Sequence, residues 1–225
     1  MTHDLSQWTA RPRPDRIVLD GRYIRLEPLD GARHGDDLFE AATKGEADAR
    51  HRYLSVYTPK SREDFGAWLH WAETHPDSVY SAVVDKTSGR ALGRQSLMRI
   101  DAANGVVEIG DIHWGPDMAG TRASTEAFFL HAAHIFDDLG YRRFEWKLNN
   151  DNAPSHRAAQ RFGFAYEGLF RQHMVIKGQN RDTAWYAMTD RDWPAIRRSF
   201  ENWLSPENFD SEGRQKRRLE EFRAT

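Results

Sequence analysis

The pattern of hydrophobic and polar positions divides the chain into segments with different periods. Residues 79–84, 91–100 and 106–114 alternate or run apolar between turn-forming residues, which predicts three consecutive strands. The dipeptide Asn104-Gly105, between the second and third runs, is a strong hairpin signal. Over residues 121–139 apolar side chains instead recur every three or four positions around a wide arc. This predicts a long, mostly buried helix that ends at Gly140.

Similar patterns of apolar and turn-forming residues occur in the rest of the chain. Ser61 can cap a helix, with Asp64 three residues later as a weak capping box. The further predicted strands are 24–29, 142–148, 165–177 and 183–188, with a turn over 178–182, and the further helices are 34–43, 61–74, 153–162 and 193–204. Early antiparallel strands followed by strand–helix–strand imply an α+β fold: one mixed, mostly antiparallel sheet of about seven strands flanked by helices.

The ends of the chain differ from its middle. Residues 1–15 contain two prolines and few apolar residues, which predicts a loose N-terminal arm. We expect one domain over residues 16–204, because no repeat or linker interrupts it. Residues 205–225 are rich in charge and form a tail that either extends from the domain or docks on it.

Composition narrows the class of protein. The chain has 225 residues, of which 39% are hydrophobic, so wholesale disorder is excluded. Lys and Arg number 32 against 34 Asp and Glu, and this balance disfavours nucleic acid as a partner. The sequence contains no Cys, which excludes disulfides, thiolate metal ligands and a cysteine nucleophile. No apolar run approaches a membrane span and the start lacks a signal-peptide pattern, so we expect a soluble, cytoplasmic protein without a membrane partner.

Several short motifs occur in a fixed order from the predicted strand over residues 106–114 onward. They are Ile109-Gly110, Ser124-Thr125-Glu126-Ala127, Leu139-Gly140-Tyr141, Asn149 with Asn152-Ala153-Pro154-Ser155, Arg161-Phe162-Gly163-Phe164 and Glu167-Gly168. In this order the chain resembles the GNAT superfamily of acyl-CoA N-acyltransferases over about residues 16–195. It is most similar to the branch that contains the ribosomal-protein-alanine and -serine N-acetyltransferases.

The resemblance implies an enzyme that moves an acetyl group from acetyl-CoA to a primary amine. The acceptor it implies is a protein N-terminus or a small amine or aminoacyl compound. Because the chain has no Cys to carry an acyl group, we expect direct attack of the amine on the thioester in a ternary complex. Members of this branch include monomers and dimers, so a homodimer stays open. The alternative is a catalytically silent acyl-CoA-binding sensor or interaction module.

The resemblance also assigns the residues that bind the cofactor. A helix N-terminus attracts phosphate through free N–H groups and its dipole, and the segment at the start of the long helix has that role in the family. Arg122 stands where the family usually has a glycine, and it can instead bind phosphate by charge. Asn152 would contact the pantetheine arm. Main-chain N–H groups over residues 112–114, at the end of the third predicted strand of the hairpin series, would polarise the thioester carbonyl. The predicted cofactor-binding residues are Ile112, His113, Trp114, Gly120, Thr121, Arg122, Ala123, Ser124 and Asn152.

Two residues are predicted to act in the reaction. Glu108, two residues before the strand glycine, matches the family's general base, and Asp111 and His113 are rivals nearby. The structural alternative for Glu108 is a solvated or ion-paired strand carboxylate. Many relatives protonate the leaving thiolate with a Tyr, but residues 152–164 contain none, and Ser155 matches the serine used by the serine-acetylating relatives.

A metal site is not expected. His131 and His134 lie three residues apart on the predicted helix, followed by Asp138, but the buried position of that helix and the lack of an evident further ligand argue against metal binding.

Overall fold

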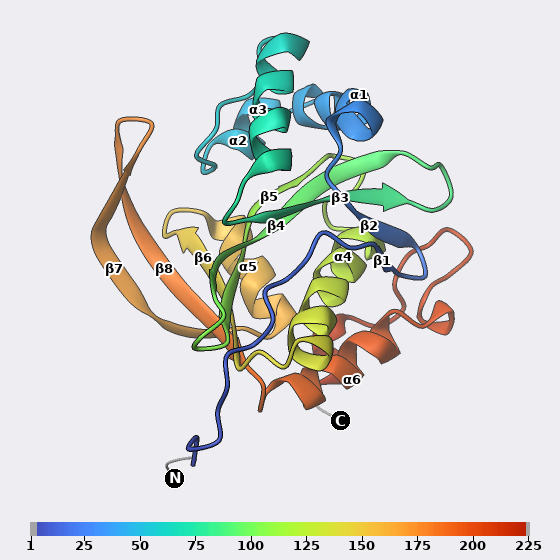
Figure 1. Cartoon of the computed structure of the whole chain (residues 1–225). Helices are drawn as coiled ribbons and strands as arrows, with labels where there is room; N and C mark the ends of the chain where they lie inside the picture. Colours follow the sequence, from blue (N-terminus) through green and yellow to red (C-terminus); the bar gives the residue numbers. More distant parts are fainter. Residues whose placement is uncertain (1–3, 224–225) are drawn as a thin grey trace.

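The computed structural model describes residues 4–223, so the first three residues of the predicted arm and the last two of the tail lie outside it. Within that span a single mixed sheet has eight strands in the order β1-β2-β3-β4-β5-β6-β8-β7 (Figure 1). All pairs are antiparallel except β5 with β6. The strands are β1 Leu19–Asp20, β2 Ile24–Pro28, β3 Val79–Asp85, β4 Ala91–Asp101, β5 Val106–Trp114, β6 Arg143–Asn149, β7 Ala165–Ile176 and β8 Gln179–Thr189. The predicted α+β sheet is confirmed.

Helices pack on the sheet in two groups. Figure 1 shows α1 and α3 together on one side and α4 and α6 together on the other. The helices are α1 Gly31–Thr43, α2 Ala47–His51, α3 Arg62–Thr74, α4 Arg122–Ala133, α5 Ala153–Phe162 and α6 Trp193–Trp203, and a π-helical turn, His134–Asp138, continues α4. Ser61 caps α3 as predicted, because its side chain accepts a hydrogen bond from the Asp64 N–H at 3.1 Å.

The largest core cluster lies between the sheet and α4, α5 and α6. Phe128 of α4 is fully buried and stacks on Phe162 of α5, with ring centroids 4.4 Å apart and planes 2° apart. Phe144 of β6 and Phe200 of α6 pack against the same ring. The wide apolar arc of the predicted long helix is therefore explained by neighbours on several sides.

Strands β5 and β6 separate soon after they begin. They pair in parallel at three positions, Val106 with Arg143, Val107 with Phe144 and Glu108 with Glu145. Beyond these positions the described residues of the two strands form no further pairs, while β5 continues on β4 and β6 continues on β8. One edge of the β5 backbone is thus left open from residue 109 onward.

A bulge distorts β5 just after this separation. The register shifts so that Ser96 pairs with Gly110 but Arg94 pairs with His113. Asp111 takes up the extra residue with φ of +45°, in the left-handed region that non-glycine residues rarely adopt. Gly110 packs closely on β4, since a Cβ there would lie 2.3 Å from Met98 Sδ and the Met98 side chain would have to move.

Two local predictions are corrected by the structure. The turn of the last hairpin falls at Lys177-Gly178 rather than over 178–182, and β8 therefore begins at Gln179. Both turn residues have positive φ, of 52° and 73°, as a two-residue hairpin turn requires. The two-residue β1 and the five-residue α2 were not predicted, because they are too short to carry a periodic signal.

Both ends of the described chain contact the domain. In the arm, Trp8 donates its indole N–H to the Ala103 carbonyl and Arg11 donates to the Gly140 carbonyl. In the tail, Leu219 is fully buried in the main core cluster and Phe209 is 8% exposed. The tail therefore docks on the domain through its few apolar residues. No helix within residues 4–223 is long and apolar enough to cross a membrane.

Candidate active site

The separation of β5 and β6 opens a cleft of about 240 Å³. Its walls come from β4, β5, β6, the start of α5, the β7–β8 hairpin and the segment over residues 53–56. Among the predicted residues, the cleft is lined by Glu108, Asp111, Ile112, Asn152 and Ser155. The fold thus brings both predicted catalytic residues to one cavity, although they are 47 residues apart in the sequence.

Glu108 lies in the cleft as part of an ion-pair network. The residue is 3% exposed, and both of its carboxylate oxygens lie 2.8 Å from Nη1 of Arg99. Nζ of Lys147 lies 3.0 Å from Glu108 Oε2 and 2.7 Å from Oε2 of Glu145. The Glu108 carboxylate is therefore held between two cations, one of which, Arg99, has a half-exposed side chain.

Asp111 forms a second acidic position in the cleft. The Tyr80 hydroxyl donates to Asp111 Oδ2 at 2.9 Å, and Nη1 of Arg94 lies 2.9 Å from Oδ1. The same Arg94 nitrogen donates to the Asp111 main-chain carbonyl at 2.8 Å, the better-aligned of the two contacts. Burial together with the Asp111 charge raises the pKa of Tyr80 above its ordinary value, so the phenol stays protonated and donates.

His113 is buried away from the cleft. It is 4% exposed, and its ring lies 4.5 Å from that of His51, centroid to centroid. Burial and the nearby Arg94 charge lower the pKa of His113 to about 2. A side chain this weakly basic, and not among the residues that line the cleft, is a poor candidate for a general base.

Ser155 is oriented by two hydrogen bonds at the start of α5. Its main-chain N–H donates to Asn152 Oδ1 at 3.2 Å, so the Asn152 side chain caps this helix. The Trp146 indole N–H donates to Ser155 Oγ at 2.9 Å. Because a hydroxyl has one hydrogen to give, a Ser155 oxygen that accepts from Trp146 keeps that hydrogen for a group in the cleft.

The predicted phosphate-binding segment forms the N-terminus of α4. Thr121 is the cap, and its side chain accepts from the Ala123 N–H at 3.2 Å and donates to the Met118 carbonyl. Gly120 precedes it with φ of +76°, and a Cβ at that position would meet no atom within 4 Å among the described residues. The Ser124 hydroxyl donates back to the Thr121 carbonyl, so it is engaged in the first turn.

Arg122 follows this cap and lies on aromatic rings. Its guanidinium carbon lies 4.3 Å from the centroid of Tyr23 and 5.6 Å from that of Phe209. No carboxylate within residues 4–223 pairs with Arg122, so its charge is not neutralised locally. The cation therefore stands beside the positive end of the α4 dipole.

The other predicted residues of β5 have separate surroundings. Ile112 lines the cleft, whereas Trp114 packs against Phe162 and its indole N–H donates to Gln95 Oε1 at 3.2 Å. His131 belongs to the same buried network, since Gln95 Nε2 lies 3.0 Å from its Nδ1 and Ser81 Oγ lies 3.3 Å from its Nε2. His134 instead contacts Asp138, so the two histidines have different partners.

Three residues of the cleft were not found by sequence reasoning. Arg99 and Lys147 contact Glu108, and Trp146 contacts Ser155, yet none of them lies in a recognised motif. Lys147 and Trp146 belong to an alternating strand in which charged and aromatic residues are expected anyway. Their contacts with Glu108 and Ser155 arise only because the fold places β4, β5, β6 and α5 next to one another.

Comparison with known proteins places this geometry in a family. The acetyltransferase (GNAT) domain family matches residues 24–165, more than half of the chain, so the protein belongs to that family of N-acetyltransferases. A crystal structure of a GCN5-related N-acetyltransferase from Brucella melitensis is 53% identical, covers 98% of this chain and 100% of its own, and superposes with a TM-score of 0.97.

More distant proteins agree with this assignment. A Bacillus licheniformis protein named "uncharacterized N-acetyltransferase p20" is 28% identical over 116 residues, and the match spans 50% of this chain and 62% of that protein. The structure of RimL, a ribosomal L7/L12 alpha-N-protein acetyltransferase in complex with coenzyme A, is 20% identical with a TM-score of 0.65. It covers 77% of this chain and 98% of its own, and at that identity it shows the shared fold. The family uses acetyl-CoA as its acetyl donor.

Proposed function

We propose that this protein transfers the acetyl group of acetyl-CoA to a primary amine that enters the cleft between β5 and β6. The observation that carries the proposal is the early separation of these strands, which exposes an open β5 edge beside Glu108 and Ser155. An open strand edge can pair with an extended amide chain, and the pantetheine arm contains two amides. The main chain from Ile112 to Trp114 and the Asn152 side chain would bind that arm.

The N-terminus of α4 would bind the pyrophosphate. Gly120 and the cap Thr121 lead into the helix and Ala123 and Ser124 lie in its first turn, where main-chain N–H groups and the helix dipole favour an anion. Arg122 would add a positive charge there. The coenzyme would then extend from α4 toward the cleft along β5.

Glu108 would accept the proton of the attacking amine. A primary ammonium must lose a proton before its nitrogen can attack, and at neutral pH most such groups are protonated. The partly exposed Arg99 now contacts both oxygens of Glu108, so an incoming ammonium can replace that cation beside the carboxylate. Asp111 is the second candidate for this step, because it also lines the cleft.

Ser155 would stabilise the leaving group. When the amine nitrogen forms its bond to the acetyl carbon, the carbon–sulfur bond breaks and CoA leaves as a thiolate. The hydroxyl hydrogen that Trp146 leaves free on Ser155 can bond to that sulfur.

Calorimetric titration with acetyl-CoA and release of free thiol in the presence of amines test this function. We expect saturable binding of acetyl-CoA near one per chain and thiol release that depends on the amine. Glu108→Ala and Ser155→Ala should lower turnover by about 100-fold while they keep the affinity for acetyl-CoA. Binding without thiol release from any amine would instead support the silent acyl-CoA-binding module, and unchanged turnover in both variants would refute the assigned residues.

A further inference from the structure

A second, larger cavity adjoins the cleft. It has a volume of about 1190 Å³ and lies between α2, the segment over residues 56–60, the start of α3, β4 and the tip of the β7–β8 hairpin. Val56 lines both cavities. Arg94, in the wall of the larger cavity, contacts Asp111 in the wall of the cleft, so the two spaces meet at this pair.

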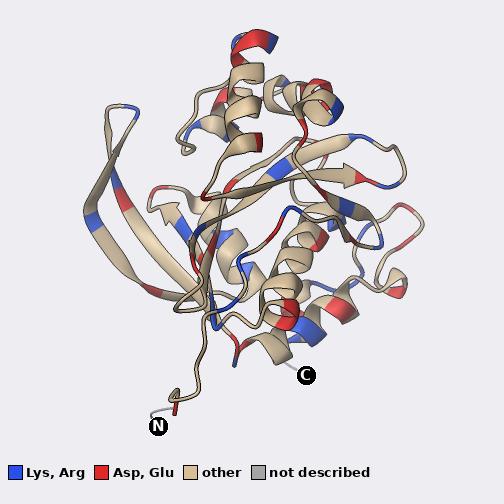
Figure 2. Ribbon diagram, viewed as in Figure 1, with Lys and Arg blue, Asp and Glu red and all other residues tan. Residues whose placement is uncertain are grey.

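Cations predominate on the walls of this cavity. Its described lining has four, Arg52, Lys60, Arg94 and Lys177, against the two carboxylates Asp48 and Asp64. The chain as a whole carries a net charge of -2, and charges of both signs are spread over the molecule (Figure 2). The excess of positive charge is therefore a local property of the cavity.

Arg94 is the fixed part of this cationic wall. Its side chain is 4% exposed, and its guanidinium carbon lies 3.8 Å from the centroid of Trp68. Both contacts with Asp111 use Nη1, so Nε and Nη2 can serve a further acceptor. A guanidinium braced on an aromatic face loses little freedom on binding, which suits recognition of a carboxylate or phosphate.

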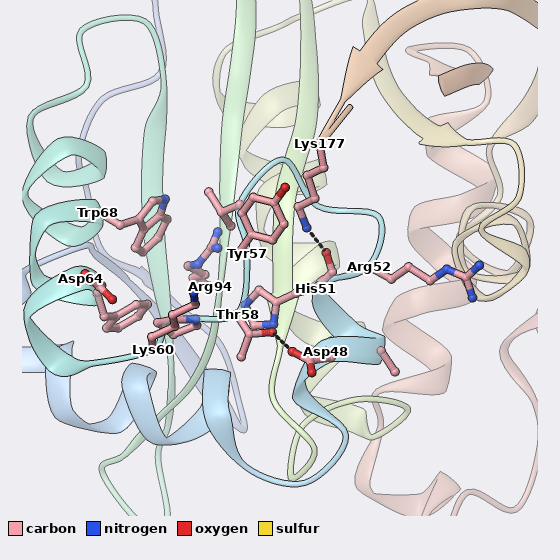
Figure 3. Close-up of a pocket in the computed structure, with 14 residues that line it drawn as sticks. Asp48, His51, Arg52, Tyr57, Thr58, Lys60, Asp64, Trp68, Arg94 and Lys177 are labelled. Atoms are coloured by element: carbon pink, nitrogen blue, oxygen red, sulfur yellow. Dashed lines mark hydrogen bonds between the residues drawn. The ribbon is translucent and has the colours of Figure 1, made fainter. Parts of the chain in front are cut away.

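Lys60 and Lys177 approach the same space from other elements. Figure 3 shows Lys177 entering from the side opposite Lys60, with Arg94 and Tyr57 between them and Arg52 directed away. Lys177 donates to the His51 carbonyl at 2.8 Å, and its Nζ lies 4.6 Å from the centroid of Tyr57. Within residues 4–223, Lys60 forms no ion pair. Two more positive charges are thus available to an anion.

The geometry points to an acceptor amine that carries an anionic group, a carboxylate or phosphate, bound in this cavity by Arg94, Lys60 and Lys177. The inference rests on the proposed acetyl transfer and names the class of its acceptor. An anion seated on Arg94 places the rest of the molecule next to Asp111, at the entrance to the cleft. The apolar lining around Phe65 and Val56 would accommodate a nonpolar portion of the same molecule.

Pairs of amines that differ in the anion test the inference. Thiol release from acetyl-CoA is measured with L-leucine against L-leucinamide for the carboxylate, and with 2-aminoethyl phosphate against ethanolamine for the phosphate. We expect kcat/KM at least tenfold higher for the anionic member of one pair or both, and the pair that responds identifies the anion.

Variants separate recognition of charge from the basicity of the amines. In the double variant Lys60→Gln/Lys177→Gln, kcat/KM should fall at least tenfold for the anionic member and remain within twofold for the neutral one, with the affinity for acetyl-CoA unchanged. Lys86→Gln removes one charge at the β3–β4 turn, outside the cavity, and should behave as the wild type. Equal losses for both members, or no loss, would overturn the inference.

The failure of this inference can be told apart from failure of the proposed function. If acetyl-CoA binds but none of the four amines releases thiol, their binding to the CoA-loaded protein is measured by calorimetry. If the anionic amine of a pair binds more tightly than the neutral one, and the double variant abolishes that difference, the anion site is supported. Only the proposed acetyl transfer would then be contradicted. Equal or absent binding of all four amines would overturn the anion site.

Discussion

Glu126 holds α4 to the first strands, and its replacement provides a quantitative test of the fold. Its carboxylate accepts three main-chain hydrogen bonds from the β1–β2 turn and the start of β2, at 2.7 Å from Arg22, 2.7 Å from Tyr23 and 2.8 Å from Ile24. Glu126 is 3% exposed and Ile24 is fully buried, so water cannot readily replace the carboxylate. Burial raises the pKa of Glu126 despite these three bonds, so desolvation of the charged carboxylate outweighs their effect on its ionisation.

The size of the effect follows from these terms. Removal of the side chain leaves three main-chain N–H groups without their acceptor, at about 1–3 kcal/mol each, and relief of the carboxylate's desolvation returns several kcal/mol. We therefore expect Glu126→Ala to lower the free energy of unfolding by about 3 kcal/mol. For a chain of this length that corresponds to a fall in Tm of about 6–12 °C.

Urea unfolding followed by circular dichroism, with a thermal scan, measures this change. Glu126→Gln keeps one acceptor oxygen and should lose about 1–2 kcal/mol. Glu63→Ala removes an exposed carboxylate from the first turn of α3 and should change stability by less than about 0.5 kcal/mol. A loss in Glu126→Ala no greater than that of the Glu63 control would refute the argument that these three bonds fasten the turn.

Three further predictions concern the cleft, the coenzyme and pH. Trp146→Phe removes the donor that orients Ser155. Steady-state kinetics should then show kcat lowered about tenfold, which corresponds to the loss of one hydrogen bond, while KM for acetyl-CoA stays within twofold. An unchanged kcat would contradict this role. Arg122→Ala should weaken the affinity for acetyl-CoA, measured by calorimetry, about five- to tenfold, whereas Arg122→Lys should keep most of that affinity. If Arg122→Ala and the wild type bind acetyl-CoA equally well, Arg122 does not contact the phosphate. Burial lowers the pKa of His113 to about 2 and that of His131 to about 3. Below pH 6.5 the unfolded chain therefore binds more protons than the folded chain, and the free energy of unfolding should decrease as the pH falls. Between pH 6.5 and 5 the two should together remove roughly 3 kcal/mol from the free energy of unfolding. Urea unfolding that is independent of pH over this range would show that they protonate without cost.

The sequence by itself determined the order and type of most elements and the family motifs. Strand β5 and helix α5 were predicted with the bounds they have in the structure, because alternation, helical periodicity, capping by Asn152 and termination at Gly163 are all local properties. The short α2 was not predicted, because a helix of five residues does not complete enough turns to show a helical period in the sequence.

The tertiary structure alone decided what surrounds each candidate site residue. Glu108 contacts Arg99 and Lys147 because β4 and β6 lie on either side of β5 in a particular register. Asp111 faces Arg94 because a bulge adds one residue to β5, and a one-residue shift moves a strand's side chains to the other face. Such contacts join positions that are far apart in the sequence, so no local pattern of residues encodes them.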